Sequence, residues 1–105
     1  MPLIKSTKEL FAALRGPASH DWSMHGYPLY FLTADGGTLK PSTVRENIGV
    51  VARATRDYFR RHGDPSWAEQ WAVVGLDINW EDPDMYDDHT GARIAPAYAE
   101  PENEE

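Results

Sequence analysis

The longest periodic segment of this chain, residues 41–62, most constrains what it can fold into. Its apolar residues recur every three or four positions, which places them on one face of an α-helix. The residues of that face are Val44, Ile48, Val51, Thr55, Tyr58 and Phe59. Pro41 suits a first helical turn, and His62-Gly63 before Asp64-Pro65 favours a stop. The pattern therefore predicts one long helix over 41–62 with a covered apolar face.

The rest of the chain predicts a short helix and several strands. Ser6-Thr7-Lys8-Glu9 has the spacing of a capping box, so a helix is expected over about 7–15. β-branched, aromatic or alternating residues predict strands at about 28–33, 38–40, 71–80 and 92–95. We expect a single α+β domain over residues 1–95, in which the long helix packs across a small, mainly antiparallel sheet.

The predicted core follows from these elements. The sheet should contribute Trp71, Val73, Leu76, Ile78 and Trp80, with Val44, Ile48, Val51 and Phe59 of the long helix opposite them. Residues 96–105 carry too little apolar surface to offset the entropy of ordering them. We therefore expect them to form an acidic, disordered tail.

Charge is divided unevenly along the chain. Residues 1–63 hold nine Lys and Arg against five Asp and Glu (+4), whereas residues 64–105 hold one, Arg93, against twelve (−11). The two parts sum to the net charge of −7. Such a division predicts that the two parts pair with each other, with a second copy of the chain in a homodimer, or with a charged partner.

Two charged surfaces are expected. The basic ridge consists of Arg45, Arg53, Arg56 and Arg60. On a helical wheel these four positions lie within an arc of roughly 80°. The acidic face begins on the strand predicted at 71–80, where alternate side chains lie about 7 Å apart. The acidic face consists of Asp77, Asn79, Glu81, Asp82 and Asp84. We expect a protein partner to bind through these charged faces.

The acidic stretch 77–91 also suggests metal chemistry, with Asp77, Asp87 and His89 as a candidate metal set for a metal-assisted hydrolase. The calcium-loop pattern is not met, because its sixth position would be Asp82 instead of Gly and its twelfth Asp88 instead of Glu. Neither GxSxG nor HExxH occurs in the sequence. The sequence therefore favours a protein that is not an enzyme and uses no cofactor.

Composition excludes several other classes. A net charge of −7 disfavours direct binding to nucleic acid, although the acidic face could itself imitate a phosphate backbone. The chain has no cysteine, which fits a reducing compartment. No apolar run approaches the roughly 20 residues that a bilayer-crossing helix needs, so no membrane association is expected. These features predict a cytoplasmic protein.

Two stretches, YPLYFLTADGG and VVGLDINWEDPDMYDDHTGARIAPAYAE, carry a resemblance. They resemble a group of small uncharacterised proteins encoded on proteobacterial plasmids, integrative elements and prophages. The similarity spans about residues 26–100, chiefly Asp77–Asp82 and Asp88–Gly91. The resemblance implies a bacterial cytoplasm and a mobile element, where accessory and counter-defence proteins are common, and it assigns no catalytic residue.

Together these observations favour a non-enzymatic protein-interaction or accessory module of a bacterial mobile element, which binds a protein partner through its charged faces. Two alternatives stay open. One is an acidic inhibitor of the counter-defence type that mimics nucleic acid, and the other is the metal-assisted hydrolase.

Overall fold

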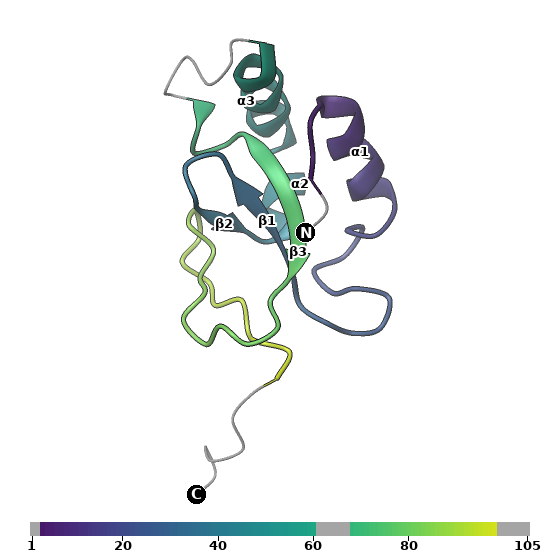
Figure 1. Ribbon diagram of the computed structural model, residues 1–105, viewed down its shortest axis with the longest axis vertical. Coiled ribbons are helices and arrows are strands. Elements are labelled where there is room, and N and C mark those ends of the chain that lie inside the picture. Colours follow the sequence, from purple (N-terminus) through teal and green to yellow (C-terminus); the bar gives the residue numbers. More distant parts are fainter. Residues whose placement is uncertain (1–2, 61–67, 99–105) are drawn as a thin grey trace, which may run out of the picture.

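A computed structural model describes residues 3–60 and 68–98 of the 105-residue chain. The elements are α1 (Thr7–Arg15), β1 (Leu29–Thr33), β2 (Thr38–Leu39), α2 (Pro41–Glu46), α3 (Ile48–Arg60) and β3 (Val73–Ile78). The strands form one antiparallel sheet in the order β2-β1-β3 (Figure 1). The α+β class and the antiparallel sheet are therefore confirmed. None of the helices in the described ranges is both long and apolar enough to cross a lipid bilayer.

The first helix forms where the capping residues predict it. Ser6 Oγ accepts a hydrogen bond from the Glu9 N–H at 3.2 Å, and Glu9 Oε1 accepts one from the Lys5 N–H at 2.7 Å. At the other end the Gly16 N–H donates to the Ala13 carbonyl at 3.2 Å. These local hydrogen bonds satisfy backbone groups that a helix leaves free at its ends, so α1 has defined limits.

The single helix predicted over 41–62 is instead divided into α2 and α3 at Asn47. The Asn47 side-chain amide donates to the Thr43 carbonyl at 2.9 Å, and its N–H is shared between the carbonyls of Thr43 and Val44. A side-chain amide that takes a backbone carbonyl competes with regular helical hydrogen bonding. The helix is therefore interrupted, and α3 is described as far as Arg60; the predicted stop lies outside the described residues.

The helices cover one face of the sheet, and the core lies between the two layers. α2 packs against β1, α3 against β3, and α1 against α3. Buried residues of this core include Leu10, Leu29, Phe31, Val44, Val51, Val73 and Leu76. Trp71, Ile78 and Ile48 are partly buried against them. Most of the predicted core is thus confirmed, but Phe59 is only partly buried and is not part of this cluster.

The strand predicted at 71–80 is shorter than expected because Asn79 turns inward. Its side chain is 2% exposed, and its amide donates to the carbonyls of Ile94 at 2.8 Å and Asp82 at 3.0 Å. Its Oδ1 accepts from the Asp82 N–H at 3.0 Å. These bonds turn the chain away from the sheet, so Trp80 is 39% exposed and its predicted place in the core is wrong.

The N-terminal segment adds a short pairing to the outer edge of β3. The Ile4 N–H donates to the Val74 carbonyl at 3.1 Å, and Leu3 lies opposite Gly75 in an antiparallel bridge. Pairing or covering the edge of a sheet satisfies backbone groups that would otherwise be open to another strand. The segment before α1 therefore belongs to the sheet as well as to the core, where Ile4 is buried.

The C-terminal segment runs beside β2 (Figure 1). The Asp88 N–H donates to the Thr38 carbonyl at 2.9 Å, and the Thr38 hydroxyl donates to the Tyr86 carbonyl at 2.7 Å. The strand predicted at 92–95 does not form; Arg93 makes only an isolated bridge with Tyr86. Irregular segments thus lie along both edges of the sheet.

The tail predicted at 96–105 begins in an ordered contact. The Ala97 N–H donates to the Asn79 carbonyl at 2.8 Å, and the Tyr98 N–H donates to the Trp80 carbonyl at 2.9 Å. The Tyr98 ring stacks on Trp80 at a centroid distance of 5.7 Å. Residues 96–98 therefore belong to the folded body, and the rest of the predicted tail lies outside the described residues.

A buried hydroxyl joins the two layers and can be tested. Thr55 of α3 is fully buried, and its Oγ1 accepts a hydrogen bond from the Val73 N–H of β3 at 3.1 Å. Thr55→Val keeps the shape but leaves this N–H without an acceptor, so we expect a loss of about 1–3 kcal/mol in the free energy of unfolding. Urea denaturation monitored by tryptophan fluorescence measures it.

Thr55→Ser is the matched control, because it keeps the acceptor and removes one methyl group, at a cost of about 1 kcal/mol. If Thr55→Val is no less stable than Thr55→Ser, the hydrogen bond between α3 and β3 contributes nothing and this account of the packing is wrong.

Candidate functional site

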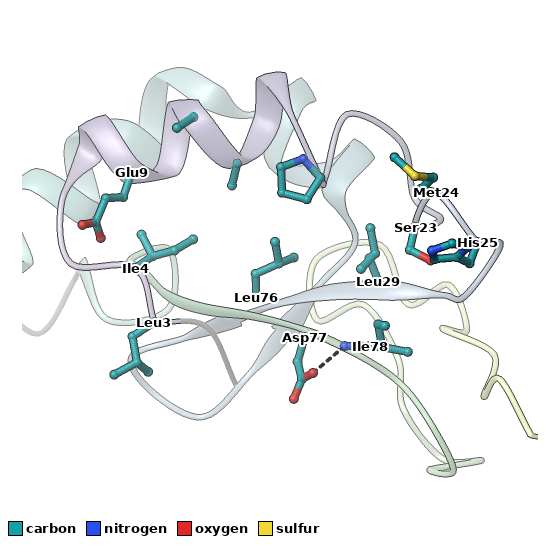
Figure 2. A pocket seen from close by; sticks show the side chains of 13 residues that line it. Leu3, Ile4, Glu9, Ser23, Met24, His25, Leu29, Leu76, Asp77 and Ile78 are labelled. Carbon is teal, nitrogen blue, oxygen red and sulfur yellow. Dashed lines mark hydrogen bonds between the residues drawn. The ribbon is translucent and has the colours of Figure 1, made fainter.

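An open apolar groove lies between α1, the loop at Met24 and the outer side of β3 (Figure 2). It encloses about 570 Å³, which is within the range of ligand-binding pockets. Its apolar lining residues are Leu3, Ile4, Ala12, Ala13, Pro17, Met24, Leu29, Leu76 and Ile78. The polar residues that border it are Glu9, Ser23, His25 and Asp77.

The groove exists because large side chains form its floor and small ones its helical wall. Leu29 and Leu76 lie on the helix-facing side of the sheet and are almost fully buried. α1 contributes Ala12 and Ala13 to the lining, and each of these side chains is a single methyl group. Since α1 makes its helix contact with α3, the space toward β3 stays open.

Two exposed apolar side chains stand at the margins of this groove. Leu3 is 60% exposed and Met24 is 93% exposed, and Figure 2 shows them on opposite sides of the groove. Exposed apolar residues that continue a concave apolar surface are typical of interaction sites. The flexible thioether side chain of Met24 can adapt to different contacts.

The polar residues at the groove do not form a catalytic arrangement. Ser23 Oγ accepts a hydrogen bond from the Tyr27 N–H at 3.0 Å, and Asp77 Oδ1 accepts one from the Ile78 N–H at 2.8 Å. No hydrogen bond of the described chain joins Ser23, His25 and Asp77 to one another, and Figure 2 shows the first two at the loop end, apart from Asp77. Ser23 and Asp77 are thus held by the backbone and not by each other.

The predicted acidic face is only partly assembled. Asp77 is its only carboxylate within β3, because the strand ends at Ile78. Asn79 is buried and belongs to the interior, which corrects its predicted place on the surface. Glu81, Asp82 and Asp84 are exposed and follow the strand.

Two of these carboxylates act on one tyrosine. Tyr30 lies directly opposite Asp77 in the register of β1 and β3. Partial burial of Tyr30, followed by the negative charges of Asp77 and Asp82, raises the pKa of its hydroxyl. Because Tyr30 alternates with the inward-facing Leu29 and Phe31, these charges lie on the sheet face opposite the helices.

The basic ridge is divided between two helices. Arg53, Arg56 and Arg60 are exposed on α3, whereas Arg45 lies on α2 and its Nη2 donates to the Ala18 carbonyl at 2.8 Å. Arg56 Nε pairs with Asp57 Oδ1 at 3.2 Å, the one ion pair among residues 3–60 and 68–98. Within those ranges the basic ridge and the acidic face therefore do not pair with each other.

The candidate metal set is not assembled. In the described ranges no three His, Asp or Glu side chains are grouped as metal ligands would be, so Asp77, Asp87 and His89 do not form the predicted site. Asp87 is 1% exposed, and its Oδ1 accepts from the N–H groups of His89 and Thr90, each at 2.8 Å. Its Oδ2 accepts from the Lys40 N–H at 2.8 Å. Both oxygens of this carboxylate are already occupied.

Asp87 instead caps the start of α2. Burial acts to raise the pKa of Asp87, but hydrogen bonds from the Thr43 side chain and from the N–H groups of Lys40, Thr90 and His89 outweigh burial and lower it. Lys40 is the N-cap residue of α2 and its own side chain makes no capping hydrogen bond. The carboxylate therefore supplies, from a distant segment, the acceptor that the helix start lacks.

A second carboxylate, which sequence reasoning missed, completes this cap. Asp21 Oδ1 accepts from the Ser42 N–H at 2.7 Å, and Asp21 Oδ2 accepts from the Ser42 hydroxyl at 3.0 Å. The signal in the sequence was Lys40 before Pro41: a helix start whose N-cap residue cannot accept a hydrogen bond needs an acceptor from elsewhere. The groove had no such signal, because it depends on where α1 and β3 lie in space.

Comparisons of the chain with protein-family models, with curated proteins and with solved structures found no match.

The role of Asp87 predicts a pH dependence. Asp87→Asn places an amide NH₂ opposite a backbone N–H, so we expect a loss of about 1–3 kcal/mol in unfolding free energy at pH 7. Because the folded pKa lies below the ordinary 3.8, the carboxylate stabilises the fold in full above about pH 4. That contribution is lost as the pH falls through the folded pKa. The difference in unfolding free energy between the wild type and Asp87→Asn should therefore decrease in that pH range.

Asp84→Asn is the control for this measurement, since it makes the same charge change at an exposed position of the same segment. Urea unfolding at a series of pH values compares the three proteins. If Asp87→Asn and Asp84→Asn have the same stability at pH 7, Asp87 does not cap α2.

Proposed function

We propose that this protein is a non-enzymatic interaction module that binds a protein partner, whose apolar side chains enter the groove between α1 and β3. The observation that carries the proposal is the open apolar groove of about 570 Å³, continued at its margins by the exposed Leu3 and Met24. Each aliphatic side chain that a partner buries there would contribute about 1.5–3 kcal/mol before the cost of association. A few such contacts suffice for specific binding.

The charged faces serve this binding as determinants of orientation and association rate. Asp77 belongs both to the acidic face and to the border of the groove, which places negative charge next to the apolar surface. Arg53 and Arg56 border a separate, shallower groove between α1 and α3. Charged residues around an apolar contact steer a partner of opposite charge. The setting implied by the resemblance, an accessory protein of a bacterial mobile element in the cytoplasm, remains part of the proposal.

The interaction module has more support than its alternatives. A nucleic-acid mimic needs carboxylates at regular intervals along a rigid element, and β3 supplies only Asp77 while Asn79 is buried. A metal-assisted hydrolase needs grouped ligands, and the oxygens of Asp87 are taken by backbone N–H groups. The apolar groove, by contrast, is already formed in the structure and can bind a partner as it stands.

Blocking the groove tests the proposal. A display library of random peptides, about twelve residues long, is selected on the wild-type protein, and the affinities of the enriched sequences are measured by fluorescence anisotropy. Ala12→Trp fills the groove from an exposed position of α1 and should weaken binding at least about ten-fold, which corresponds to about 1.4 kcal/mol. Gln70→Trp adds the same indole at an exposed site outside the groove and should leave affinity unchanged.

Thermal unfolding of both variants checks that each is folded. If peptides bind Ala12→Trp as tightly as wild type, or if no sequence is enriched, the groove is not the binding site and the proposed function is wrong.

A further inference from the structure

The charged groups at the groove are all of one sign. Its thirteen lining residues include Glu9 and Asp77 but no Lys or Arg. Glu9 is engaged by the Lys5 N–H in the cap of α1. Asp77, by contrast, borders the groove from β3 while its carboxylate points to the other face of the sheet, so a partner that extends from the groove past the edge of β3 reaches this carboxylate.

A second carboxylate, Asp82, lies a few residues beyond Asp77, just after the end of β3. Asp77 lies opposite Tyr30, and the charges of Asp77 and Asp82 both act on the Tyr30 hydroxyl. Asp82 follows at the exit from β3 and is exposed. A long cationic side chain that lies beside Tyr30 would therefore be attracted by both charges.

Both carboxylates are fixed by hydrogen bonds to the backbone. Asp77 Oδ1 accepts from the Ile78 N–H at 2.8 Å, and Asp82 Oδ1 accepts from the Asp84 N–H at 2.9 Å. The Asp82 main chain is itself held by the buried amide of Asn79. Groups that are already positioned lose little conformational entropy when a ligand binds.

Neither Asp77 nor Asp82 forms an ion pair within the described ranges. The ion pair found there joins Arg56 to Asp57 on α3, and Arg93 uses its Nε to donate to the Pro83 carbonyl at 3.2 Å. The negative charge at Asp77 and Asp82 is therefore available to a partner. Its sign repels phosphate groups and attracts Lys and Arg.

We infer that the partner segment is basic as well as apolar: its apolar side chains lie in the groove, and a neighbouring Lys or Arg side chain is held by Asp77 and Asp82. This inference rests on the proposed function, because it identifies the chemistry of the segment that the same groove binds. The apolar contacts supply most of the affinity, and the two carboxylates select a cationic neighbour over a neutral or acidic one.

The test uses peptides selected on the full-length chain and two double variants. Asp77→Asn/Asp82→Asn removes both charges while keeping an acceptor oxygen at each position, and we expect at least about ten-fold weaker binding. Glu46→Gln/Asp88→Asn changes the net charge equally at exposed positions outside the acidic face and the groove, and we expect less than about a two-fold effect. The affinity of the wild type should decrease as the NaCl concentration is raised from roughly 0.05 M to 0.5 M. The affinity of Asp77→Asn/Asp82→Asn should depend less on salt.

A change in the peptide gives the same answer without altering the protein. Replacing the Lys and Arg residues of a selected peptide by Gln should weaken its binding to wild type by the same factor. The replacement should have little effect on binding to Asp77→Asn/Asp82→Asn.

The outcomes separate this inference from the proposed function. If Ala12→Trp abolishes binding but neither the charge variants nor the Gln-substituted peptide changes it, the basic neighbour is refuted and the groove stands. If Ala12→Trp has no effect, the groove itself is refuted. Sedimentation velocity tests whether the groove binds a second copy of the chain. If the wild type is a dimer and Ala12→Trp is a monomer, the groove is a dimer interface and the inference of a separate basic partner is wrong.

Discussion

The capping of α2 by two distant carboxylates fixes the irregular segments of this structure to its regular elements. The helix begins at Lys40-Pro41 without a side-chain acceptor of its own, and Asp21 and Asp87 supply acceptors from opposite ends of the chain. Because an uncapped and buried helix start is costly, both segments are fixed to the same point. The loop that precedes β1 and the segment that follows β3 thereby become parts of one body, although neither has regular secondary structure.

This arrangement explains how irregular segments present defined surfaces. The loop held by Asp21 continues to Met24 and forms one end of the apolar groove, and Arg45 fixes the same loop through the Ala18 carbonyl. The segment held by Asp87 begins at Asn79, whose buried amide fixes the backbone at Asp82. Polar side chains therefore position the loop end of the groove and the backbone at Asp82, whereas α1 and β3 form the groove itself. Such positioning lowers the entropic cost of binding.

Local patterns predicted the elements but not these long-range contacts. The capping box at Ser6 predicted α1, and apolar periodicity predicted the helical region of α2 and α3. The interruption at Asn47 was missed because Val44, Ile48 and Val51 keep the helical period across it. Asp87 was interpreted as a metal ligand because no local pattern distinguishes an exposed Asp from one that binds a backbone N–H 47 residues away. The groove could not be predicted either, since it arises from small side chains facing large ones on elements far apart in sequence.

The fold places the basic and the acidic residues of the sequence on different surfaces. The arginines of α3 lie on the helical layer, whereas Asp77 projects from the other face of the sheet and Asp82 follows it. Since the sheet separates them, the two sets do not neutralise each other within the described part of the chain, and each keeps its potential for contacts outside it. Only the acidic set adjoins the apolar groove, through Asp77. Apolar burial and negative charge thus meet at the end of β3, which is why a segment that is both apolar and basic complements this protein better than one that is only apolar.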